Sequence, residues 1–376
     1  MKTKIFYVIN RLSNAGPVSV LYNLVSNINL ECYDVSIVTL SSEISESKMS
    51  QFKNLPIHLF SLDSYAKSNS LISKIRAFKK IIESSQPDIV HAHCVRSLVY
   101  SILLKNNYKV VFTCHNYPGA VERVLYGNFL GTIIILLNHI FSRLADKTVA
   151  CSESISIDLK KNHNRIMDYV NNGVNYPIWN SSIEEKTNLK SRLGLQQNIK
   201  YFISIGRLSP EKKMDILVDY FNRIKDSGLG LIILGDGEQY NQLKAINTSP
   251  NVIFTGYTTD VRSYIVASDY YISASDGEGL SMALLECMSV GLPMLLSDIS
   301  SHRSVLSKFN DEVGFIYDKN CYNDFLNKMD QLRTIDYDFA SSLIRKQYEE
   351  KYTAQVMTRN YERIYKSLHR KCTLQS

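Results

Sequence analysis

The sequence predicts an α/β protein with two domains, each built around a mostly parallel β-sheet. Short apolar runs alternate with helix-like segments along the chain, which is typical of strand, helix and strand units with right-handed crossovers. The chain has 376 residues, too many for one ordinary core and suited to two domains of roughly 150 to 200 residues. Hydrophobic residues make up 45% of the chain and charged residues 21%, which indicates a globular protein.

Six apolar runs predict the strands of the first domain, with helices between them. They cover residues 5–9, 35–40, 57–60, 89–91, 110–113 and 148–150. The loop after the first run reads Ser13-Asn14-Ala15-Gly16-Pro17. Pro17 suits the first turn of a following helix, so this part of the chain is expected to form a strand, a loop and a helix.

A linker and a second set of strands follow. Residues 176–186 contain Pro177, Asn180 and paired serines, which predict a linker. The later strands are expected at residues 201–205, 229–234, 252–255, 270–273, 293–296 and 313–316, and a last helix at about residues 353–368. The predicted parts are therefore a first domain at residues 1–176, a second at 187–352 and a C-terminal helix within 353–376.

Glu278 and Glu286 are the most informative pair of residues in the second domain. A Gly-rich turn joins them in Glu278-Gly-Leu-Ser-Met-Ala-Leu-Leu-Glu286. Ser281 is a good N-cap residue, so the N–H groups of Gly279, Leu280 and Ser281 should point out of a helix N-terminus, which attracts phosphate. The two carboxylates would then accept hydrogen bonds from sugar and ribose hydroxyls. This pattern favours a nucleotide-sugar site.

Basic residues follow the strand at residues 201–205, where an α/β sheet places its ligands. Arg207 offers a planar fork to phosphate oxygens, and Lys212 adds a compact positive charge. Both suit a diphosphate that departs with extra negative charge. Lys213 is equally well explained as an exposed residue at a helix start.

Further short motifs extend this interpretation over nearly the whole chain. They are Pro87-Asp-Ile-Val-His91-Ala-His93, Thr113-Cys-His115, Val149-Ala-Cys-Ser152, Asn172-Gly173-Val174, Leu234-Gly-Asp-Gly237 and Phe254-Thr-Gly256. Their order and spacing resemble those of the retaining glycosyltransferases of family 4. The resemblance implies the GT-B architecture, in which two Rossmann-like domains face a cleft and the C-terminal helix crosses back to the first domain.

The resemblance also implies roles for individual residues. Arg207 and Lys212 would hold the donor diphosphate, Glu286 the ribose diol, and Glu278 would lie at the donor sugar. His115 matches the histidine on the acceptor side, near the transferring carbon. The catalytic candidates are thus His115, Glu278, Arg207 and Lys212. The candidate substrate-binding residues are Gly16, Arg207, Lys212, Gly256, Tyr257, Glu278, Gly279, Leu280, Ser281 and Glu286.

Two positions depart from the family pattern. The first loop usually carries a Gly-Gly pair near the donor phosphates, whereas here only Gly16 is free to take a positive φ without strain. An aromatic residue is frequent where this chain has Leu280, which affects the shape of the sugar pocket but leaves the backbone amide in place.

These residues predict transfer of a hexose or N-acetylhexosamine from a nucleoside diphosphate sugar, with UDP favoured, to a hydroxyl of a growing surface glycan. A lipid-linked glycan is among the expected acceptors, and the anomeric configuration should be retained by front-face substitution. Two alternatives remain open, a non-catalytic sugar-nucleotide-binding partner of another transferase and a sugar-nucleotide epimerase. A nicotinamide-dependent oxidoreductase is disfavoured because Gly235-Asp-Gly237-Glu-Gln-Tyr240 lacks the third glycine.

Neither a metal nor a cofactor is expected. His91 and His93 should point to one side of a strand, but no carboxylate or cysteine at metal-ligand spacing accompanies them. The single Asp-x-Asp, Asp336-Tyr-Asp338, falls in a late helical region and is interpreted as a solvated face. Basic residues and helix N–H groups would then stabilise the leaving diphosphate.

The net charge of +7 raises the question of a charged partner. Residues 121–147 contain the apolar run Leu130-Gly-Thr-Ile-Ile-Ile-Leu-Leu137 with basic residues on either side. This run is far short of the ~20 apolar residues that span a bilayer. It is either a helix resting on anionic lipid or a buried helix of the first core. No recognisable nucleic-acid-binding motif accompanies the charge.

The cysteines and the first residues of the sequence indicate the cellular compartment of the protein. The seven cysteines are scattered without a CxxC pair, as expected for reduced thiols. The sequence leads from two lysines directly into a strand, with no stretch that resembles a signal peptide. We therefore expect a cytoplasmic protein, with peripheral contact at the inner face of the cell membrane as an option.

Overall fold

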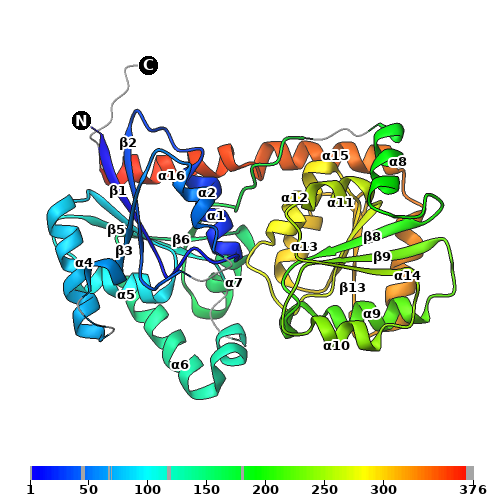
Figure 1. Ribbon diagram of the computed structural model, residues 1–376, viewed down its shortest axis with the longest axis horizontal. Coiled ribbons are helices and arrows are strands. Elements are labelled where there is room, and N and C mark those ends of the chain that lie inside the picture. The colour runs from blue at the N-terminus through cyan, green and yellow to red at the C-terminus, as the bar shows by residue number, and fades with distance from the viewer. Residues whose placement is uncertain are drawn as a thin grey trace. The chain divides into compact units, whose positions relative to one another are not determined.

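The computed structural model describes residues 2–43, 47–66, 68, 70–116, 120–178 and 182–369, with the backbone alone at residues 120–126 and 163. The chain forms two compact units. Unit 1 comprises Met1–Asn175 and Ala354–Ser376, and unit 2 comprises Tyr176–Thr353. Each contains one parallel sheet with helices between successive strands (Figure 1). The predicted fold class, two parallel-sheet α/β domains of the GT-B type, is confirmed.

The sheet of unit 1 has seven strands in the order β3-β2-β1-β4-β5-β6-β7. Its strands are β1 (Thr3–Ile9), β2 (Tyr33–Thr39), β3 (His58–Ser61), β4 (Ile89–Ala92), β5 (Lys109–Cys114), β6 (Lys147–Ala150) and β7 (Asp168–Tyr169). Its helices are α1 (Gly16–Val25), α2 (Met49–Lys53), α3 (Leu62–Tyr65), α4 (Leu71–Ser85), α5 (Val95–Leu103), α6 (Ala120–Leu144), α7 (Glu153–His163) and α16 (Ala354–Leu368).

The sheet of unit 2 has six strands in the order β10-β9-β8-β11-β12-β13. Its strands are β8 (Lys200–Ile205), β9 (Leu229–Leu234), β10 (Val252–Gly256), β11 (Tyr270–Ser273), β12 (Met294–Ser297) and β13 (Gly314–Tyr317). Its helices are α8 (Ile183–Arg192), the 3₁₀ turn η1 (Pro210–Lys212), α9 (Met214–Arg223), α10 (Tyr240–Ile246), α11 (Val261–Ala267), α12 (Met282–Val290), α13 (Ser300–Leu306), α14 (Tyr322–Arg333) and α15 (Tyr337–Lys351). In Figure 1, α9 and α10 lie on one side of this sheet and α11 and α12 on the other.

The strand order reverses once in each sheet, and this reversal locates the candidate sites. In unit 1 it falls between β1 and β4, and in unit 2 between β8 and β11. Both faces of each sheet are covered, so the strands read as nearly continuous apolar runs. Ligands of open parallel sheets bind beyond the carboxyl ends of the strands at such a reversal.

The last helix, α16, completes the core of unit 1. Tyr361 and Tyr365 on this helix are buried, and their hydroxyls lie 2.8 Å from Thr113 Oγ1 and 2.8 Å from His91 Nδ1, respectively. The Tyr365 hydroxyl also lies 3.1 Å from that of Tyr7. Helix α16 is therefore tied to β1, β4 and β5 by buried hydrogen bonds.

Two short elements differ from the sequence expectation. Helix α8 begins at Ile183, inside the segment expected to be a linker, because Ser182 caps it by accepting from the Glu185 N–H at 3.1 Å. Strand β7 was not expected, since its two residues are exposed and carry no apolar pattern. The linker positions 179–181 lie outside the described residues.

Candidate active site

The candidate diphosphate and sugar residues of unit 2 follow two neighbouring strands. Arg207 and Lys212 come after β8, while Ser275 and Glu278 come after β11. These strands are paired at the reversal of the sheet, and their carboxyl ends meet at one edge. The fold thus brings two segments that are about 70 residues apart in sequence to the place where a parallel sheet binds ligands.

Lys212 and Glu278 form an ion pair at this edge. The Lys212 Nζ donates to Glu278 Oε1, and the Ser275 hydroxyl donates to the same oxygen at 2.9 Å. The two charged side chains are 21% and 13% exposed, so the pair is shielded from water on most sides. Burial alone would raise the pKa of Glu278, but the nearby Lys212 ammonium and these hydrogen bonds hold that pKa below the usual value of 4.5.

The two loops are also joined through their backbones and a second ion-pair group. The Asp276 N–H donates to the Glu211 carbonyl oxygen at 2.8 Å. Asp276 carboxylate oxygens lie 3.4 Å from Lys213 Nζ and 3.1 Å from Lys319 Nζ. Lys213 therefore has a structural partner of its own, whereas Lys212 turns toward Glu278.

His302 was not identified from the sequence, although it belongs to this group. It is fully buried in α13, and its Nδ1 donates to the Ser297 carbonyl oxygen at 2.9 Å. Its Nε2 is buried and has no hydrogen-bond partner within the described part of the chain. Burial lowers its pKa to about 4, and Glu278 and Lys212 act on it with opposite signs. His302 is therefore neutral at pH 7, and only the tertiary structure places it near the ion pair.

Arg207 is held loosely. Its side chain is 69% exposed, and its guanidinium lies 3.5 Å from Glu238 Oε2. Exposed pairs of this kind contribute little to stability, so the guanidinium can turn to an incoming anion at small cost. Arg207 is thus loosely paired in solvent, whereas Lys212 is paired in a shielded site.

Glycines allow the loops after β8, β9 and β10 to pack closely. A Cβ atom on Gly235 would lie 1.9 Å from the Gly206 carbonyl oxygen, and one on Gly237 would lie 2.5 Å from that of Leu208. The Gly235 N–H donates to the Gly256 carbonyl oxygen at 3.1 Å. The two close contacts explain why glycine occupies positions 235 and 237.

The remaining candidates after β10 differ in exposure and backbone. Gly256 has φ +67°, a left-handed conformation that favours glycine. The following residue, Tyr257, is 63% exposed and presents a large aromatic side chain at this edge of unit 2. Its exposure leaves the ring accessible to a ligand.

Helix α12 starts as the sequence predicts. Ser281 is the N-cap and accepts from the Leu284 N–H at 3.4 Å, so the positive end of the helix faces the segment that carries Gly279 and Glu278. Leu280 is buried, which fits its interpretation as part of a pocket wall. Glu286 lies one turn into the helix and is half-buried.

Two tyrosines lie close to Glu286. Its negative charge contributes to raising the pKa values of Tyr176 and Tyr348, although burial is the larger cause for both; the pKa of Tyr348 reaches about 12. Both hydroxyls therefore stay protonated at pH 7 and remain hydrogen-bond donors. Glu286 and Glu278 thus occupy different surroundings, tyrosines around one and a lysine beside the other.

In unit 1, His115 follows β5 and is half-buried at the end of a row formed with the buried His93 and His91. His115 Nε2 and His93 Nδ1 are 3.0 Å apart, and the rings of His93 and His91 are 4.3 Å apart. Burial lowers the pKa of His115 to about 4 and that of His91 to about 3. His115 is therefore neutral at pH 7, and His93 fixes the orientation of its ring.

Gly16 is the first residue of α1, after a loop at the carboxyl end of β1. It does not adopt a positive φ, and a Cβ atom on it would meet nothing within 4 Å. Neither the backbone conformation nor the packing of this loop therefore requires glycine at position 16. Pro17 lies in the first helical turn, as expected.

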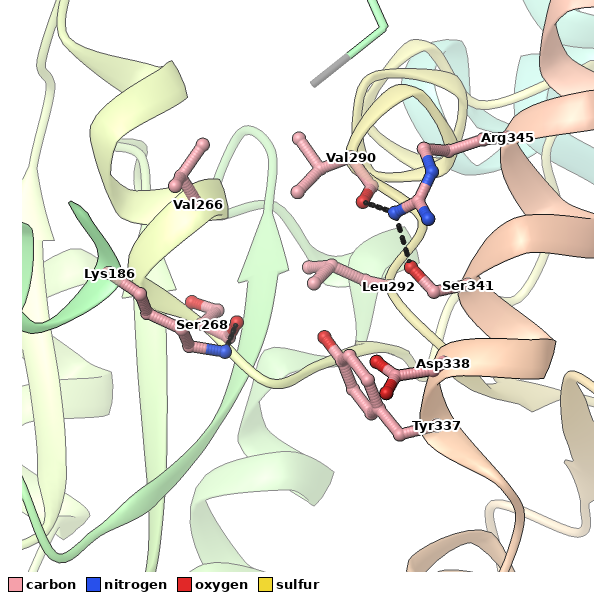
Figure 2. Close-up of a pocket in the computed structure, with 9 residues that line it drawn as sticks. All are labelled: Lys186, Val266, Ser268, Val290, Leu292, Tyr337, Asp338, Ser341 and Arg345. Carbon is pink, nitrogen blue, oxygen red and sulfur yellow. Dashed lines mark hydrogen bonds between the residues drawn. The ribbon is translucent and has the colours of Figure 1, made fainter. Parts of the chain in front are cut away.

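A small, partly open cavity in unit 2 is separate from these residues. It has a volume of about 70 Å³ and lies beside α15, where Tyr337, Asp338 and Arg345 line it (Figure 2). The Arg345 guanidinium is already bound to the Val290 carbonyl oxygen at 3.2 Å and to the Ser341 hydroxyl at 2.6 Å. This cavity is too small for a nucleotide sugar. Within the described chain, no group of three or more His, Cys, Asp or Glu residues is arranged to hold a metal ion.

Two family patterns match the chain on either side of the unit boundary. Residues 15–176 match the family described as Glycosyltransferase Family 4, and residues 185–350 match Glycosyl transferases group 1. Among curated proteins, the chain is 24% identical over 326 residues to the UDP-Gal:alpha-D-GlcNAc-diphosphoundecaprenol alpha-1,3-galactosyltransferase of Escherichia coli, covering 80% of each. It is 22% identical to the O-antigen biosynthesis glycosyltransferase WclY of Escherichia coli, covering 98% of this chain and 99% of that one.

A solved structure shares the fold over the full length. HepE of Anabaena in complex with UDP and glucose superposes with a TM-score of 0.77 at 15% identity, covering 97% of this chain and 100% of HepE. The architecture, the two consecutive family matches and the relatives agree with one another. The chain belongs to the glycosyltransferases of the GT-B, family 4 type, which act on sugar nucleotides in glycan biosynthesis.

Proposed function

We propose that this glycosyltransferase moves a hexose or N-acetylhexosamine from a UDP-sugar to a hydroxyl of a growing surface glycan carried on a lipid. The choice of UDP is supported by the HepE complex and by the name of the Escherichia coli galactosyltransferase. That name also specifies a diphosphoundecaprenol-linked acceptor, which supports a lipid-linked substrate here. The protein would then work at the inner face of the cell membrane.

The observation that carries the proposal is the Lys212–Glu278 ion pair at the switch point of unit 2. A shielded cation and a shielded carboxylate, held side by side, match the two ends of a sugar phosphate. Lys212 would meet the phosphate and Glu278 the sugar hydroxyls. Arg207 would turn from solvent to the same diphosphate, and α12 would direct its positive end toward it.

The reaction that we propose is front-face substitution with retention. The bond between the anomeric carbon and the diphosphate oxygen breaks, and a bond to the acceptor oxygen forms on the same face. The acceptor proton passes to the departing phosphate, whose charge Arg207 and Lys212 stabilise. Glu278 is a poor candidate for a nucleophile, because Oε1 already accepts from Lys212 and Ser275.

His115 would act as a neutral group in this reaction. With a pKa of about 4, its imidazole carries no charge at pH 7 and can only donate or accept hydrogen bonds. We assign it to positioning the donor sugar and acceptor hydroxyl. Gly16 would allow close approach of the first loop to the donor, and Tyr257 would contact the nucleotide.

Independence from metal ions is part of the proposal. In the single Asp-x-Asp segment, the Asp336 side chain is the N-cap of α15 and accepts from the Phe339 N–H at 3.1 Å. That carboxylate is therefore engaged in capping the start of a helix. Lys212, Arg207 and the α12 N-terminus supply the positive charge that a metal ion provides elsewhere.

The test is a donor panel followed by product analysis. UDP-, GDP- and ADP-sugars are screened for thermal stabilisation, since a ligand at a hundred times its dissociation constant adds roughly 2.7 kcal/mol. The best donor is then incubated with a diphosphoundecaprenol-linked sugar, with and without EDTA, and the product anomer is read by NMR. Retention with EDTA-resistant turnover is expected. An inverted product, loss of turnover in EDTA, or binding without any transfer would each contradict the proposal.

A further inference from the structure

Helix α6 presents most of its large apolar residues to solvent, although Phe141 packs against the core of unit 1. Phe129, Leu130, Ile133, Leu136, Ile140 and Leu144, hereafter the outer stripe, are 38% to 82% exposed. On the opposite side Gly131, Asn138 and Ser142 are buried, and α6 packs against α5. A helix in the core of a water-soluble unit shows the reverse arrangement. Of the two interpretations of residues 121–147, the described side chains of Gly127–Leu144 favour the surface helix over the buried core helix, since only 17% of this stretch is buried.

The outer stripe is continuous along one helix face. Its members at positions 129, 133, 136, 140 and 144 are three or four residues apart, the spacing of neighbours on a helix surface. The sixteen residues from 129 to 144 extend about 24 Å along the helix axis. The helix breaks at Gly127, where φ is +76° and ψ is 167°, so the stripe begins just after a sharp turn. In Figure 1 this end of α6 extends away from the sheet of unit 1.

The same helix has the composition of a membrane segment but not the surroundings of a spanning one. Residues Gly127–Leu144 have a mean hydropathy of 1.2, and by length and composition they suffice to cross a membrane. However, Arg165 donates to the Ser142 hydroxyl at 2.7 Å and to the Ser142 carbonyl oxygen at 3.1 Å, and β6 starts three residues after the helix ends. These contacts hold one face against unit 1, so α6 can lie along a bilayer surface with the other face in lipid.

The net charge of unit 1 indicates which kind of membrane surface the outer stripe would contact. Unit 1 contains 24 Lys and Arg residues against 13 Asp and Glu, a net +11, whereas unit 2 contains 19 against 23, a net −4. The whole positive excess of the chain therefore lies in the unit that carries the outer stripe. At the C-terminal end of the stripe, Arg143 is exposed, and Ile166, which follows Arg165, is 82% exposed. Apolar and basic groups thus occur together, as in interfacial helices.

We propose that the outer stripe of α6 docks unit 1 on the surface of an anionic lipid bilayer, with the helix lying in the membrane plane. The inference deepens the proposed transfer to a lipid-linked acceptor and rests on that proposal for its purpose. A second copy of the chain is a poorer occupant, because a symmetric contact through α6 brings together two units of net +11.

The first experiment measures vesicle binding by flotation, without any substrate. The wild type should bind vesicles of phosphatidylglycerol and phosphatidylethanolamine, less at high salt, and bind phosphatidylcholine weakly. The triple variant Phe129→Ser, Ile133→Ser, Leu136→Ser should lose at least tenfold in partitioning. Its matched control is Leu71→Ser with Ile72→Ser on α4, where two apolar side chains are 62% and 63% exposed. The control should stay within twofold of the wild type, and equal binding by the triple variant would overturn the inference.

A second experiment separates a membrane from a protein partner. Phe129→Trp in a Trp179→Phe background places the only tryptophan on the outer stripe. Its emission should shift to the blue only when anionic vesicles are added, and Leu71→Trp should not respond. A blue-shifted emission without vesicles, together with a wild-type dimer that the triple variant converts to monomer, would show a subunit interface and refute membrane docking.

Sugar transfer and membrane docking of α6 can be refuted independently of each other. Vesicle binding without sugar transfer would remove the proposed function and leave this inference standing. Transfer to a lipid-linked acceptor in detergent, with no binding to anionic vesicles, would remove this inference alone. Melting temperature and UDP binding of the triple variant check that the fold is intact, which is expected because the three side chains are 38% to 82% exposed.

Discussion

At the scale of single residues, the Lys212–Glu278 ion pair links diphosphate binding to sugar binding, two roles that the sequence analysis assigned separately. The resemblance places the diphosphate and the sugar at separate residues, but in the structure the candidate diphosphate ligand is the partner of the candidate sugar ligand. A donor must therefore share or displace this pair when it binds. Charge at one end of the donor should then affect affinity at the other.

Substitution of the two glutamates by glutamine tests this coupling. Glu278→Gln removes a negative charge beside Lys212, so free UDP should bind as tightly as to the wild type or severalfold more tightly, while transfer falls about a hundredfold. Glu286→Gln should weaken UDP and UDP-sugar alike, because both contain ribose. Calorimetry with UDP and a turnover assay on both variants provide the measurement. Equal loss of UDP affinity in the two variants would contradict these roles.

Arg207 tests stabilisation of the leaving group. Arg207→Ala should lower kcat by about a hundredfold, roughly 3 kcal/mol in the barrier, and change donor affinity less, because the charge it meets grows as the bond breaks. Folding should be unaffected, since the side chain is 69% exposed. Arg192→Ala is a matched control, because Arg192 is 60% exposed and pairs with Asp260 at 3.2 Å. Near-normal turnover of Arg207→Ala would remove it from the mechanism.

At the scale of elements, Asp269 anchors α8 to the sheet of unit 2. Its carboxylate is almost fully buried and lies 2.9 Å from Lys186 Nζ, 3.5 Å from Lys190 Nζ and 3.3 Å from Lys200 Nζ. It also accepts from the Tyr201 N–H at 2.9 Å. Burial opposes its ionisation, but the three lysines keep the pKa of Asp269 below its usual value.

Loss of this charge should destabilise unit 2. Asp269→Asn leaves the buried ammonium of Lys190 and the shielded one of Lys186 without a counter-charge, at a cost of about 3 kcal/mol in the free energy of unfolding. Asp219→Asn, which removes an exposed pair with Arg223, should cost less than about 1 kcal/mol. Urea denaturation of both variants measures the difference. Similar midpoints would show that α8 does not depend on Asp269.

The sequence predicted most elements because their signals are local. The central strands are apolar runs, so residues 229–234 and 270–273 were placed with the bounds that the structure shows. Strand β7 was missed since only pairing with β6 defines it. The start of α8 was missed although Ser182, Glu184 and Glu185 form a recognisable N-terminal signal.

The residues of the candidate site also differ in whether a local sequence signal predicts their placement. Ser281 as N-cap could be predicted because it depends on neighbours in sequence. The placement of His302 near Glu278, and the pairing of His93 with His115, depend on contacts between strands and helices distant in sequence. No local pattern encodes them. The roles of the candidate residues in binding and catalysis stay predictions until they are measured.

At the scale of the whole molecule, the buried His91, His93 and His302 and the half-buried His115 should make stability depend on pH. Burial lowers the pKa values of His91, His93, His115 and His302 from the usual 6.5, so these side chains are neutral when folded and protonated when unfolded at mildly acid pH. Stability from this source is fully present above pH 6.5 and decreases as the pH falls toward 4. Each group contributes up to about 1.4 kcal/mol per pH unit.

The distribution of these histidines predicts the order of acid unfolding. Three of the four lie in unit 1 and one in unit 2, so unit 1 should open first as the pH decreases from 6.5 to about 5. Hydrogen exchange read by mass spectrometry, peptide by peptide, measures the two units separately. His91→Gln should reduce the pH dependence of unit 1 and leave that of unit 2 unchanged. Loss of protection in unit 2 before unit 1 would contradict the prediction.

The placement of α16 sets the order in which a nascent chain can fold. Unit 2 is contiguous and ends at Thr353, but unit 1 also needs Tyr361 and Tyr365, which are synthesised after the whole of unit 2. At 5 to 20 residues per second, the polypeptide between the two parts of unit 1 takes roughly 10 to 35 s to make. During that interval Tyr7, His91 and Thr113 lack their hydrogen-bond partners on α16. The unit whose synthesis begins first is therefore completed after unit 2. A premature stop just before residue 354 would release a complete unit 2 joined to an open unit 1, a substrate for chaperones and proteases.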